Sequence, residues 1–202
     1  MNLIDSLIKE KWLKTPRIIR AFKKIKREDF MPDDIKVLAE INEAMPIGCD
    51  QTISQPLTVA FMMEQLQPEP GNKILDVGAG SGWTTALLAE ITGRKGKVIA
   101  VEIIPSLKVF GRKNVLKYNF VKKGIVQFIC ADGSLGYEKE APYDRILASA
   151  SASKIPQAWK NQLKIGGKIV SPVKKSIWVL EKKSEKKFKT IKYPGFVFVP
   201  LI

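Results

Sequence analysis

The stretch ILDVGAGSGWTTALLAE contains the residues of this chain best suited to hold a ligand. Gly78, Gly80 and Gly82 lie between a short apolar run and a helical pattern. Glycine permits positive φ and lets a ligand approach the backbone, and ligands of open α/β sheets bind at such strand ends. Trp83 occupies the last position of G-x-G-x-x-G, which departs from the dinucleotide fingerprint, and the Gly-Lys-Ser/Thr of a phosphate loop is absent.

Three carboxylates lie at or near the ends of three consecutive predicted strands, and their chemistry narrows the choice of ligand. Asp76 precedes the glycine loop, where its charge would repel a pyrophosphate but suits a sulfonium or an amino group. Glu102, 20 residues after Gly82, can accept both hydroxyls of a ribose, and Asp132 can hold an adenine amino group. The combination predicts S-adenosylmethionine (AdoMet) as cofactor and therefore a methyltransferase. The candidate cofactor residues in this part of the chain are Asp76, Gly78, Ala79, Gly80, Ser81, Gly82, Glu102, Ile103, Asp132 and Gly133.

A second polar stretch, DQTISQP, lies between two helical patterns. Gln51, Thr52, Ser54 and Gln55 offer amides and hydroxyls in close succession, more than a plain linker needs. Such neutral groups donate hydrogen bonds and can orient an anionic substrate. An alternative interpretation is structural, with Ser54 capping the helix that Pro56 opens.

The chain contains no histidine, which excludes histidine-based acid–base catalysis, histidine-ligated metals and the usual catalytic triads. A nucleophilic role for Ser54 is unsupported, because no base that would activate it is evident. Methylation of nucleic-acid amino groups typically uses [DNS]-P-P-[YFW] after the fourth strand, where this chain has ASASASKIP. Cytosine-C5 chemistry needs a cysteine after proline, whereas Cys49 follows glycine and Cys130 follows isoleucine.

Hydrophobic periodicity predicts helices in the first third of the chain. Helical spacing covers residues 1–29 with an interruption at Pro16, and a further short helical piece is predicted over residues 34–44. MPIGCD is predicted to be a turn or loop. A helix with proline in its first turn is predicted from Pro56.

Beyond this helix the pattern predicts strands alternating with helices. Five short apolar runs predict strands at KILDVG, KVIAVE, IVQFICAD, YDRILASAS and KIVSPV. Helices are predicted at WTTALLAEIT, over residues 105–122 and at IPQAWKNQLK, the last closed by Gly166 and Gly167. The remaining pattern predicts an antiparallel hairpin of SIWVLEKK and FKTIKYP and a last strand, GFVFVPLI.

This order of elements predicts an α/β protein with a mostly parallel, doubly wound sheet. The expected architecture is the Rossmann-like fold of AdoMet-dependent methyltransferases, with N-terminal helices and an antiparallel C-terminal hairpin. A chain of 202 residues fits a single domain. Within it we expect N-terminal helices and the polar segment over residues 1–55, a cofactor-binding core over 56–173, and the hairpin with the final strand over 174–202.

The composition favours a cytoplasmic protein. No apolar run reaches the roughly 18 residues of a membrane span, and the N-terminus MNLIDSLIKEKW lacks the apolar region of a secretion signal. Cys49 and Cys130 are far apart and lack metal-ligand spacing, which favours free thiols in a reducing compartment. We expect no membrane association and no metal.

The chain is strongly basic, with 34 Lys and Arg against 20 Asp and Glu and a net charge of +14. Such an excess can attract nucleic acid, a membrane surface or acidic substrates. The excess is spread out, with ten basic and six acidic residues over 1–36 and eight and two over 174–192. This patterning alone favours a solvated surface over a dedicated binding face.

Taken together, several stretches resemble the protein-L-isoaspartate O-methyltransferase family, from about Ile18 to the C-terminus. The glycine loop is common to many methyltransferases, whereas QTISQP followed by a helix and the terminal F-V-P-L are more specific. The resemblance is carried by AFKKIKREDFMP, IGCDQTISQP, ILDVGAGSGWTTALLA, GKVIAVE, ADGSLGYEKEAPYDRI, the IP of ASKIPQAW, QLKIGGKIVSPV and FVFVPLI.

The resemblance implies an activity, a substrate and site residues. The family transfers the methyl group of AdoMet to the α-carboxylate of isoaspartyl residues in damaged proteins, which starts their repair and leaves S-adenosyl-L-homocysteine. It implies that Gln51, Thr52 and Ile53 close over cofactor and substrate, and that Ser54 is the active-site residue. The residues implied to meet the substrate are Thr52, Ser54, Val199, Pro200 and Leu201.

A carboxylate acceptor fits a chain without histidine. A carboxyl group with a pKa of about 4 is already anionic at neutral pH and can attack a methyl group without a general base. Such a reaction needs alignment of nucleophile, methyl and sulfur, together with neutral donors that hold the carboxylate. The hydroxyls of Thr52 and Ser54 suit that role, so we interpret Ser54 as an orienting donor.

The chain departs from the family pattern at three places. Asp50 stands where glycine is common, lysines follow Val173 in place of a glycine-rich turn, and the sequence ends at Ile202, before contacts that longer members make. Two alternatives stay open: an RNA methyltransferase, motivated by the net charge, and a non-catalytic AdoMet-binding module, motivated by Asp50 and the short tail. We expect a monomer that acts on isoaspartyl proteins, and no nucleic-acid partner.

Overall fold

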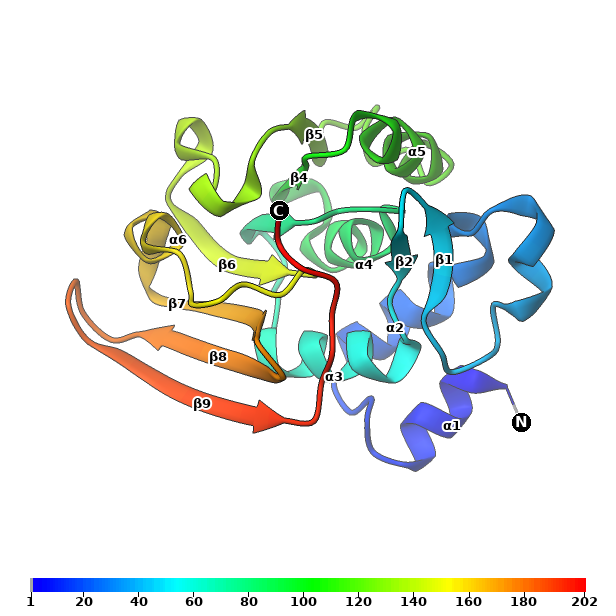
Figure 1. The fold of residues 1–202 in the computed structure, drawn as a ribbon, viewed down its shortest axis with the longest axis horizontal. Helices are drawn as coiled ribbons and strands as arrows, with labels where there is room; N and C mark the ends of the chain where they lie inside the picture. The colour runs from blue at the N-terminus through cyan, green and yellow to red at the C-terminus, as the bar shows by residue number, and fades with distance from the viewer. Residues whose placement is uncertain (1) are drawn as a thin grey trace.

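The computed structural model describes residues 2–202 and contains a central seven-stranded sheet in the order β5-β4-β3-β6-β7-β8-β9 (Figure 1). The strands from β5 to β7 are parallel to their neighbours, and β8 and β9 are added antiparallel. This arrangement confirms the predicted α/β, doubly wound sheet with an antiparallel C-terminal hairpin. The strands are β3 (Lys73–Val77), β4 (Lys97–Glu102), β5 (Val126–Cys130), β6 (Tyr143–Ala148), β7 (Leu163–Val173), β8 (Ser176–Lys182) and β9 (Phe188–Pro194).

Helices cover both faces of the sheet. One apolar core joins one face to α2, α3, α4 and α5, and a second joins the other face to α6 through Trp159. The change of face follows from the strand order, because the chain moves from β3 outward to β5 and then returns to β6. The helices are α1 (Leu3–Lys9), α2 (Pro16–Lys24), α3 (Pro56–Leu66), α4 (Trp83–Thr92), α5 (Pro105–Leu116) and α6 (Gln157–Gln162).

The two central parallel strands are apolar because they are buried on both faces. In β3 all residues after Lys73 are buried, and β4 is buried from Val98 to Glu102. Their parallel register pairs Asp76 with Ala100, so the loops that follow β3 and β4 open at the same edge of the sheet. This edge is where the glycine loop and Glu102 meet.

The stretch predicted as a turn, MPIGCD, is instead mostly a strand. Met45–Gly48 forms β1 and pairs antiparallel with β2, Gln51–Ile53, so the polar segment belongs to a β-hairpin. Cys49 and Asp50 form its two-residue turn, with φ of 53° and 57°. Two successive residues with positive φ match the turns whose twist suits a hairpin. The buried Met45 and Ile47 alternate with exposed neighbours, the short period-two pattern that indicates a strand.

Four other predicted boundaries are corrected. The piece expected over 34–44 is a 3₁₀ turn, Asp33–Leu38, and the helix expected over 105–122 ends at Leu116. Gly166 and Gly167 do not close a helix but lie inside β7, near a shift in its register with β6. The expected last strand is an irregular segment with a single bridge, between Ser151 and Pro200. Figure 1 shows this segment crossing the molecule from the end of β9 toward the centre.

None of the helices within residues 2–202 combines the length and the apolar character needed to cross a membrane.

The β1–β2 turn leads to a prediction about stability. Replacing Asp50 with glycine removes a side chain from a left-handed position, so we expect the free energy of unfolding to rise by about 0.5–1 kcal/mol. Replacing Asp50 with valine should lower it by about 1–2 kcal/mol, because a β-branched side chain fits this conformation poorly. Urea unfolding of the three proteins measures both changes, and a glycine variant less stable than the parent would contradict the turn geometry.

Candidate active site

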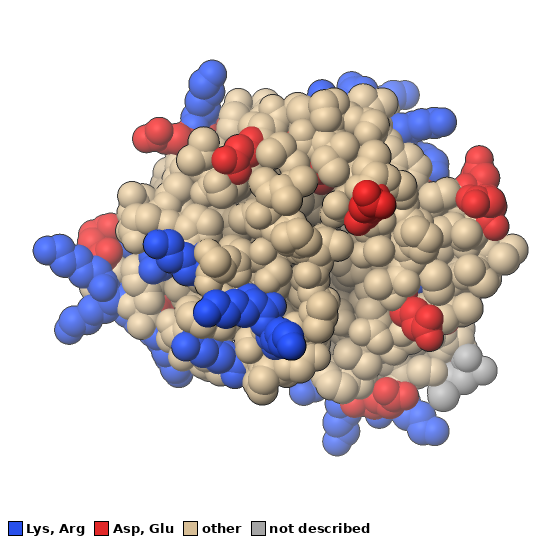
Figure 2. Space-filling model, in the orientation of Figure 1, with Lys and Arg blue, Asp and Glu red and all other residues tan. Residues whose placement is uncertain are grey.

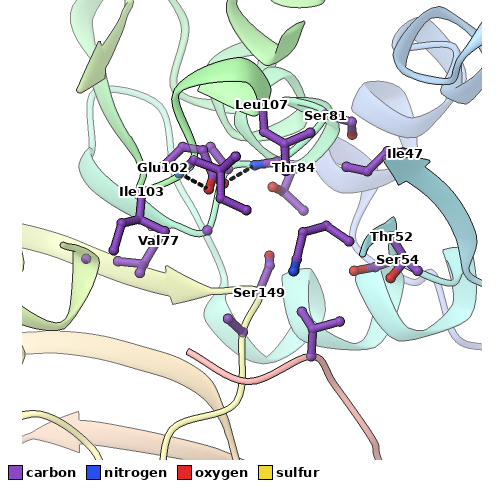
Figure 3. Close-up of a pocket in the computed structure, with 18 of the residues that line it drawn as sticks. Ile47, Thr52, Ser54, Val77, Ser81, Thr84, Glu102, Ile103, Leu107 and Ser149 are labelled. Atoms are coloured by element: carbon purple, nitrogen blue, oxygen red, sulfur yellow. Dashed lines mark hydrogen bonds between the residues drawn. The ribbon is translucent and has the colours of Figure 1, made fainter. Parts of the chain in front are cut away.

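One cavity opens at the carboxyl edge of the sheet and encloses about 740 Å³, counting its open mouth. It lies between the glycine loop, the β1–β2 hairpin and the C-terminal segment. Figure 3 shows Thr52 and Ser54 on one side, Val77, Glu102 and Ile103 on the other, and Ser149 between them. Fourteen of the predicted site residues line it: Gln51, Thr52, Ile53, Ser54, Gly78, Ala79, Gly80, Ser81, Glu102, Ile103, Gly133, Val199, Pro200 and Leu201.

Glu102 holds the glycine loop in place. One carboxylate oxygen accepts the backbone N–H of Gly80 at 2.8 Å, and the other accepts that of Ile104 at 3.0 Å. The side chain lies in the cavity wall and is 6 % exposed. Each oxygen keeps a second acceptor position. This carboxylate therefore suits two neighbouring hydroxyls of a ribose, which agrees with AdoMet as cofactor.

Close packing of the loop against α5 requires glycine at Gly82. A Cβ built at Gly82 would lie 2.8 Å from the carbonyl oxygen of Gly111 and 2.9 Å from a methyl group of Val115. Gly82 also has a φ of 85° and begins α4. Its role is therefore to bring loop and helix together, and Gly82 itself is not in the cavity wall.

Asp76 lies behind the loop and does not line the cavity. Its side chain is fully buried, and one oxygen accepts hydrogen bonds from Thr84 at 3.1 Å and from Thr85 at 2.6 Å. The other oxygen has no hydrogen-bond partner within residues 2–202. Burial raises the pKa of Asp76 from 3.8 to about 6, with a smaller contribution from the charge of Glu102. Asp76 thus reaches the cavity through Thr84, which is in the wall.

Ser54 faces the cavity and does not cap α3. The N-cap of α3 is Gln55, whose side chain makes no capping hydrogen bond but donates to the carbonyl of Asn42 at 2.8 Å. Within the described part of the chain, no hydrogen bond is formed by the hydroxyl of Ser54, which leaves it available to a ligand. The alternative interpretation of Ser54 as a helix cap is therefore wrong.

The buried guanidinium of Arg27 fixes the backbone beside Ser54. Arg27 is 7 % exposed and donates to the carbonyls of Ala39, Ile41, Glu43 and Ser54, at 3.2, 3.1, 2.7 and 3.3 Å. Burial lowers its pKa to about 10, so it stays charged at neutral pH. Its charge therefore reaches the active-site segment through the carbonyl of Ser54.

Arg27 also packs against the start of α4. Its Cζ lies 5.6 Å from the ring centre of Trp83, which lines the cavity. Phe22 packs edge-on against the same indole, with ring centres 5.7 Å apart. Arg27 thus joins the Ser54 segment to the glycine-loop side of the cavity. The stretch AFKKIKREDFMP contains Arg27, but nothing local in it indicates this role.

The C-terminal segment closes a third side of the cavity. The N–H of Ser151 donates to the carbonyl of Val199 at 2.7 Å, and the N–H of Leu201 donates to the carbonyl of Ser151 at 2.9 Å. These bonds hold Val199, Pro200 and Leu201 in the cavity wall. The irregular, extended backbone of this segment suits contact with an extended substrate.

The end of β5 contributes Gly133 but not Asp132. The Asp132 carboxylate accepts the N–H of Ser134 at 2.8 Å in a local turn and is absent from the cavity wall. A Cβ at Gly133 would lie 2.4 Å from a methyl group of Val77, so glycine is required there. The carbonyl of Gly133 accepts the indole N–H of Trp159 at 2.8 Å.

Ten wall residues were not among the predictions. Ser149 and Ala150 follow β6 in the ASAS stretch, the strand end where enzymes that methylate nucleic-acid amino groups carry [DNS]-P-P-[YFW]. Most of the others are apolar side chains whose cavity exposure depends on tertiary packing. The ten are Ile47, Val77, Trp83, Thr84, Val101, Ile104, Leu107, Ser149, Ala150 and Ile202.

The buried Asp76 leads to a prediction about pH. Because its folded pKa is raised, the folded protein binds more protons than the unfolded chain, so the free energy of unfolding should fall as the pH rises from about 4 to about 6. Asp76→Asn should abolish this decline and raise stability at pH 7 by about 1–3 kcal/mol. AdoMet affinity should fall about tenfold, because a negative charge near a cationic ligand is lost. Urea unfolding across this pH range and calorimetric titration measure both, and equal pH profiles would contradict the assignment.

Comparison with known proteins identifies the family of this chain. Residues 1–202 match the model of the family described as protein-L-isoaspartate(D-aspartate) O-methyltransferase (PCMT). A protein-L-isoaspartate O-methyltransferase of Methanopyrus kandleri is 41 % identical over 205 residues, covering 100 % of this chain and 90 % of the relative. One of Thermococcus sibiricus is 39 % identical over 208 residues, covering 100 % and 92 %.

A solved structure shares the fold over its full length. A Plasmodium falciparum chain, described as a PCMT and crystallised with S-adenosyl-L-homocysteine, superposes with a TM-score of 0.90 at 22 % identity. The match covers 100 % of this chain and 99 % of that one. The cavity between a glycine loop, a polar hairpin and the C-terminal segment thus occurs in a chain that belongs to the protein-L-isoaspartate O-methyltransferase family.

Proposed function

We propose that this chain transfers the methyl group of AdoMet to the α-carboxylate of L-isoaspartyl residues in damaged proteins, with Ser54 orienting the acceptor. One observation carries the assignment of roles. Among the 24 residues that line the cavity, Glu102 is the sole charged side chain, and the hydroxyls and amides near it are neutral. An anionic nucleophile would therefore meet donors without a cation that reduces its reactivity.

The chain's own residues provide binding and alignment. Bound AdoMet supplies an electrophilic methyl group on a sulfonium. Glu102 suits its ribose, the glycine loop allows close approach to the backbone, and the apolar side chains of Ile103 and Leu107 provide walls for a flat ring. These contacts hold the donor while the acceptor enters from the opposite side of the cavity.

On the acceptor side of the cavity, three hydroxyl groups lie near the C-terminal segment Val199–Leu201. Thr52, Ser54 and Ser149 present hydroxyl groups toward the cavity (Figure 3). A carboxylate needs no proton removed at neutral pH, so a donor that orients it is sufficient. The segment Val199–Leu201 supports binding of the substrate backbone beside these hydroxyls.

The cellular setting is also a proposal. Cys49 and Cys130 are both free and exposed, which supports a reducing compartment such as the cytoplasm. A monomer remains the expectation from the sequence. The acceptors would be isoaspartyl-containing proteins and peptides.

The activity is tested with two peptides that differ only in an aspartyl or an isoaspartyl linkage. We expect base-labile label from methyl-labelled AdoMet on the isoaspartyl peptide alone, because an aspartyl linkage does not present the α-carboxylate as a free group. Equal labelling of both peptides, or of neither, would contradict the proposed function.

Ser54→Ala tests the role of the hydroxyl. We expect kcat for the isoaspartyl peptide to fall about 100-fold, since misalignment of the acceptor is costly, while the affinity for S-adenosyl-L-homocysteine stays within about threefold. Steady-state kinetics and calorimetry provide the two values. A variant that loses both equally would make Ser54 a cofactor residue instead.

Arg27→Lys tests the positioning role of the guanidinium. Lysine keeps the charge but cannot reach four carbonyls, so we expect a loss of about 2–4 kcal/mol in stability and a fall in kcat at a temperature where the variant is folded. The matched control is Arg145→Lys, because Arg145 also donates to backbone carbonyls, those of Leu66, Gln67 and Asp144. Arg145 lies outside the cavity wall.

The control separates positioning from stability. Arg145→Lys should lower the free energy of unfolding with kcat nearly unchanged, whereas Arg27→Lys should lower both. If kcat falls in both variants in proportion to the loss in free energy of unfolding, Arg27 has no specific effect on the Ser54 segment.

A further inference from the structure

The positive charge is concentrated in the last part of the chain. Residues 146–202 contain 12 lysines, no arginine and two glutamates, so this part carries ten of the fourteen net positive charges. The asymmetry is not evident in short stretches of sequence, because α6 and the β7–β9 strands bring together lysines that lie up to 32 residues apart, from Lys160 to Lys192. The asymmetry identifies one end of the sheet as strongly basic.

Most of this charge is not neutralised within the chain. Lys164 pairs with Asp144 at 2.7 Å, Lys182 pairs with Glu185 at 3.0 Å, and Lys183 pairs with Glu181. No carboxylate within residues 2–202 lies within 4.0 Å of the ammonium groups of the other nine. These nine are Lys154, Lys160, Lys168, Lys174, Lys175, Lys186, Lys187, Lys189 and Lys192.

Part of this charge lies on the face of the sheet that α6 covers. Trp178 of β8 and Lys192 of β9 are directly opposite each other, and the ammonium group of Lys192 lies 4.0 Å from the ring centre of Trp178. The ammonium group of Lys160 in α6 lies 5.9 Å from the ring centre of Phe188. Figure 2 shows blue side chains gathered at the lower left, over the region of α6 and β7–β9 in Figure 1.

The basic region reaches the segment that lines the cavity. The carbonyl of Lys174 accepts the hydroxyl of Ser151 at 3.1 Å, and Ser151 is bonded to Val199 and Leu201. The carbonyl of Lys175 accepts the N–H groups of Gly195 and Phe196, where the C-terminal segment begins. The turn between β7 and β8 therefore places two unpaired lysines beside the proposed peptide site.

We propose that this lysine face, defined by Lys160, Lys174 and Lys192, binds acidic polypeptide that flanks the isoaspartyl residue; the proposal rests on the proposed function. Deamidation of an asparagine converts a neutral amide into a carboxylate, so the damaged chain is more acidic than its parent. Carboxylates within about 8 Å of these lysines interact at physiological salt. The face therefore increases the rate of encounter with acidic substrates and leaves the methyl transfer to the cavity.

The chemistry of the face favours polypeptide over RNA. Single-stranded nucleic acid binds by stacking its bases on free aromatic faces, and here lysine ammonium groups lie over Trp178 and Phe188. Arginine, which recognises phosphate through paired donors, is absent from residues 146–202. Flexible lysines suit loose, sequence-tolerant attraction of carboxylates.

The test uses isoaspartyl peptides flanked by glutamates, by serines or by lysines. Wild-type protein should show kcat/KM about tenfold higher on the glutamate-flanked than on the serine-flanked peptide at low salt, with the preference weakening as salt is raised. The triple variant Lys160→Gln, Lys174→Gln, Lys192→Gln should lose most of this preference, and the change should lie in KM. The matched control is Lys113→Gln, Lys122→Gln, Lys123→Gln, which removes three exposed charges near α5 and β5, at the other end of the sheet.

The control variant and an RNA competitor distinguish the lysine face from an effect of net charge and from a nucleic-acid site. The control variant should retain the preference; an equal loss in both variants would reduce the effect to net charge and overturn the proposal, as would a wild-type protein with no preference. A uridine oligonucleotide that binds more tightly than the glutamate-flanked peptide, and only when the lysine face is intact, would assign the face to nucleic acid instead. Failure to methylate any isoaspartyl peptide would reject the proposed function itself.

Discussion

The hydrogen bond from the N–H of Gly80 to the carboxylate of Glu102 joins the ends of the adjacent strands β3 and β4, and the cavity is built around it. The bond forms because β3 and β4 run parallel in register and both end at the same edge of the sheet. It also depends on Gly82 and Gly111, since a Cβ on either would collide with the other segment. A side chain at Gly82 or Gly111 would separate the glycine loop from α5 and move the loop away from Glu102. The cofactor side of the cavity would then lose its shape.

The acceptor side of the cavity is held in place by the buried side chain of Arg27. Arg27 donates to backbone carbonyls of two segments and packs against Trp83, so one buried cation joins the β1–β2 hairpin to the cofactor side. A buried charge without a carboxylate partner is costly unless dipoles surround it. Here four carbonyls accept from the two terminal nitrogens of Arg27 and offset part of the cost, while its Nε has no partner within residues 2–202. No lysine or arginine side chain among the described residues lies in the cavity wall, where a cation would bind the substrate anion too strongly.

Short-range electrostatic interactions in the cavity and long-range attraction by surface lysines occur in different parts of this chain. Within the cavity, neutral hydroxyls and one carboxylate provide orientation at short range. At the β9 end of the sheet, lysines provide an attraction that acts over a longer distance and falls with salt. Such a separation allows substrates to be gathered by charge while the reacting carboxylate keeps its reactivity.

The sequence by itself determined the α/β sheet and the glycine loop, because buried parallel strands and strand-end glycines have local signatures. It also indicated that Glu102 and the Ser54 segment lie at the ligand site, and both line the cavity. Tertiary structure decided which strand-end acids reach the cavity: Asp76 is covered by Thr84 and Thr85, and Asp132 turns back to Ser134. It also decided the β1–β2 hairpin, the role of Arg27 and the wall position of Ser149. These depend on contacts between residues far apart in the chain, such as Arg27 with Ser54, which no local pattern specifies.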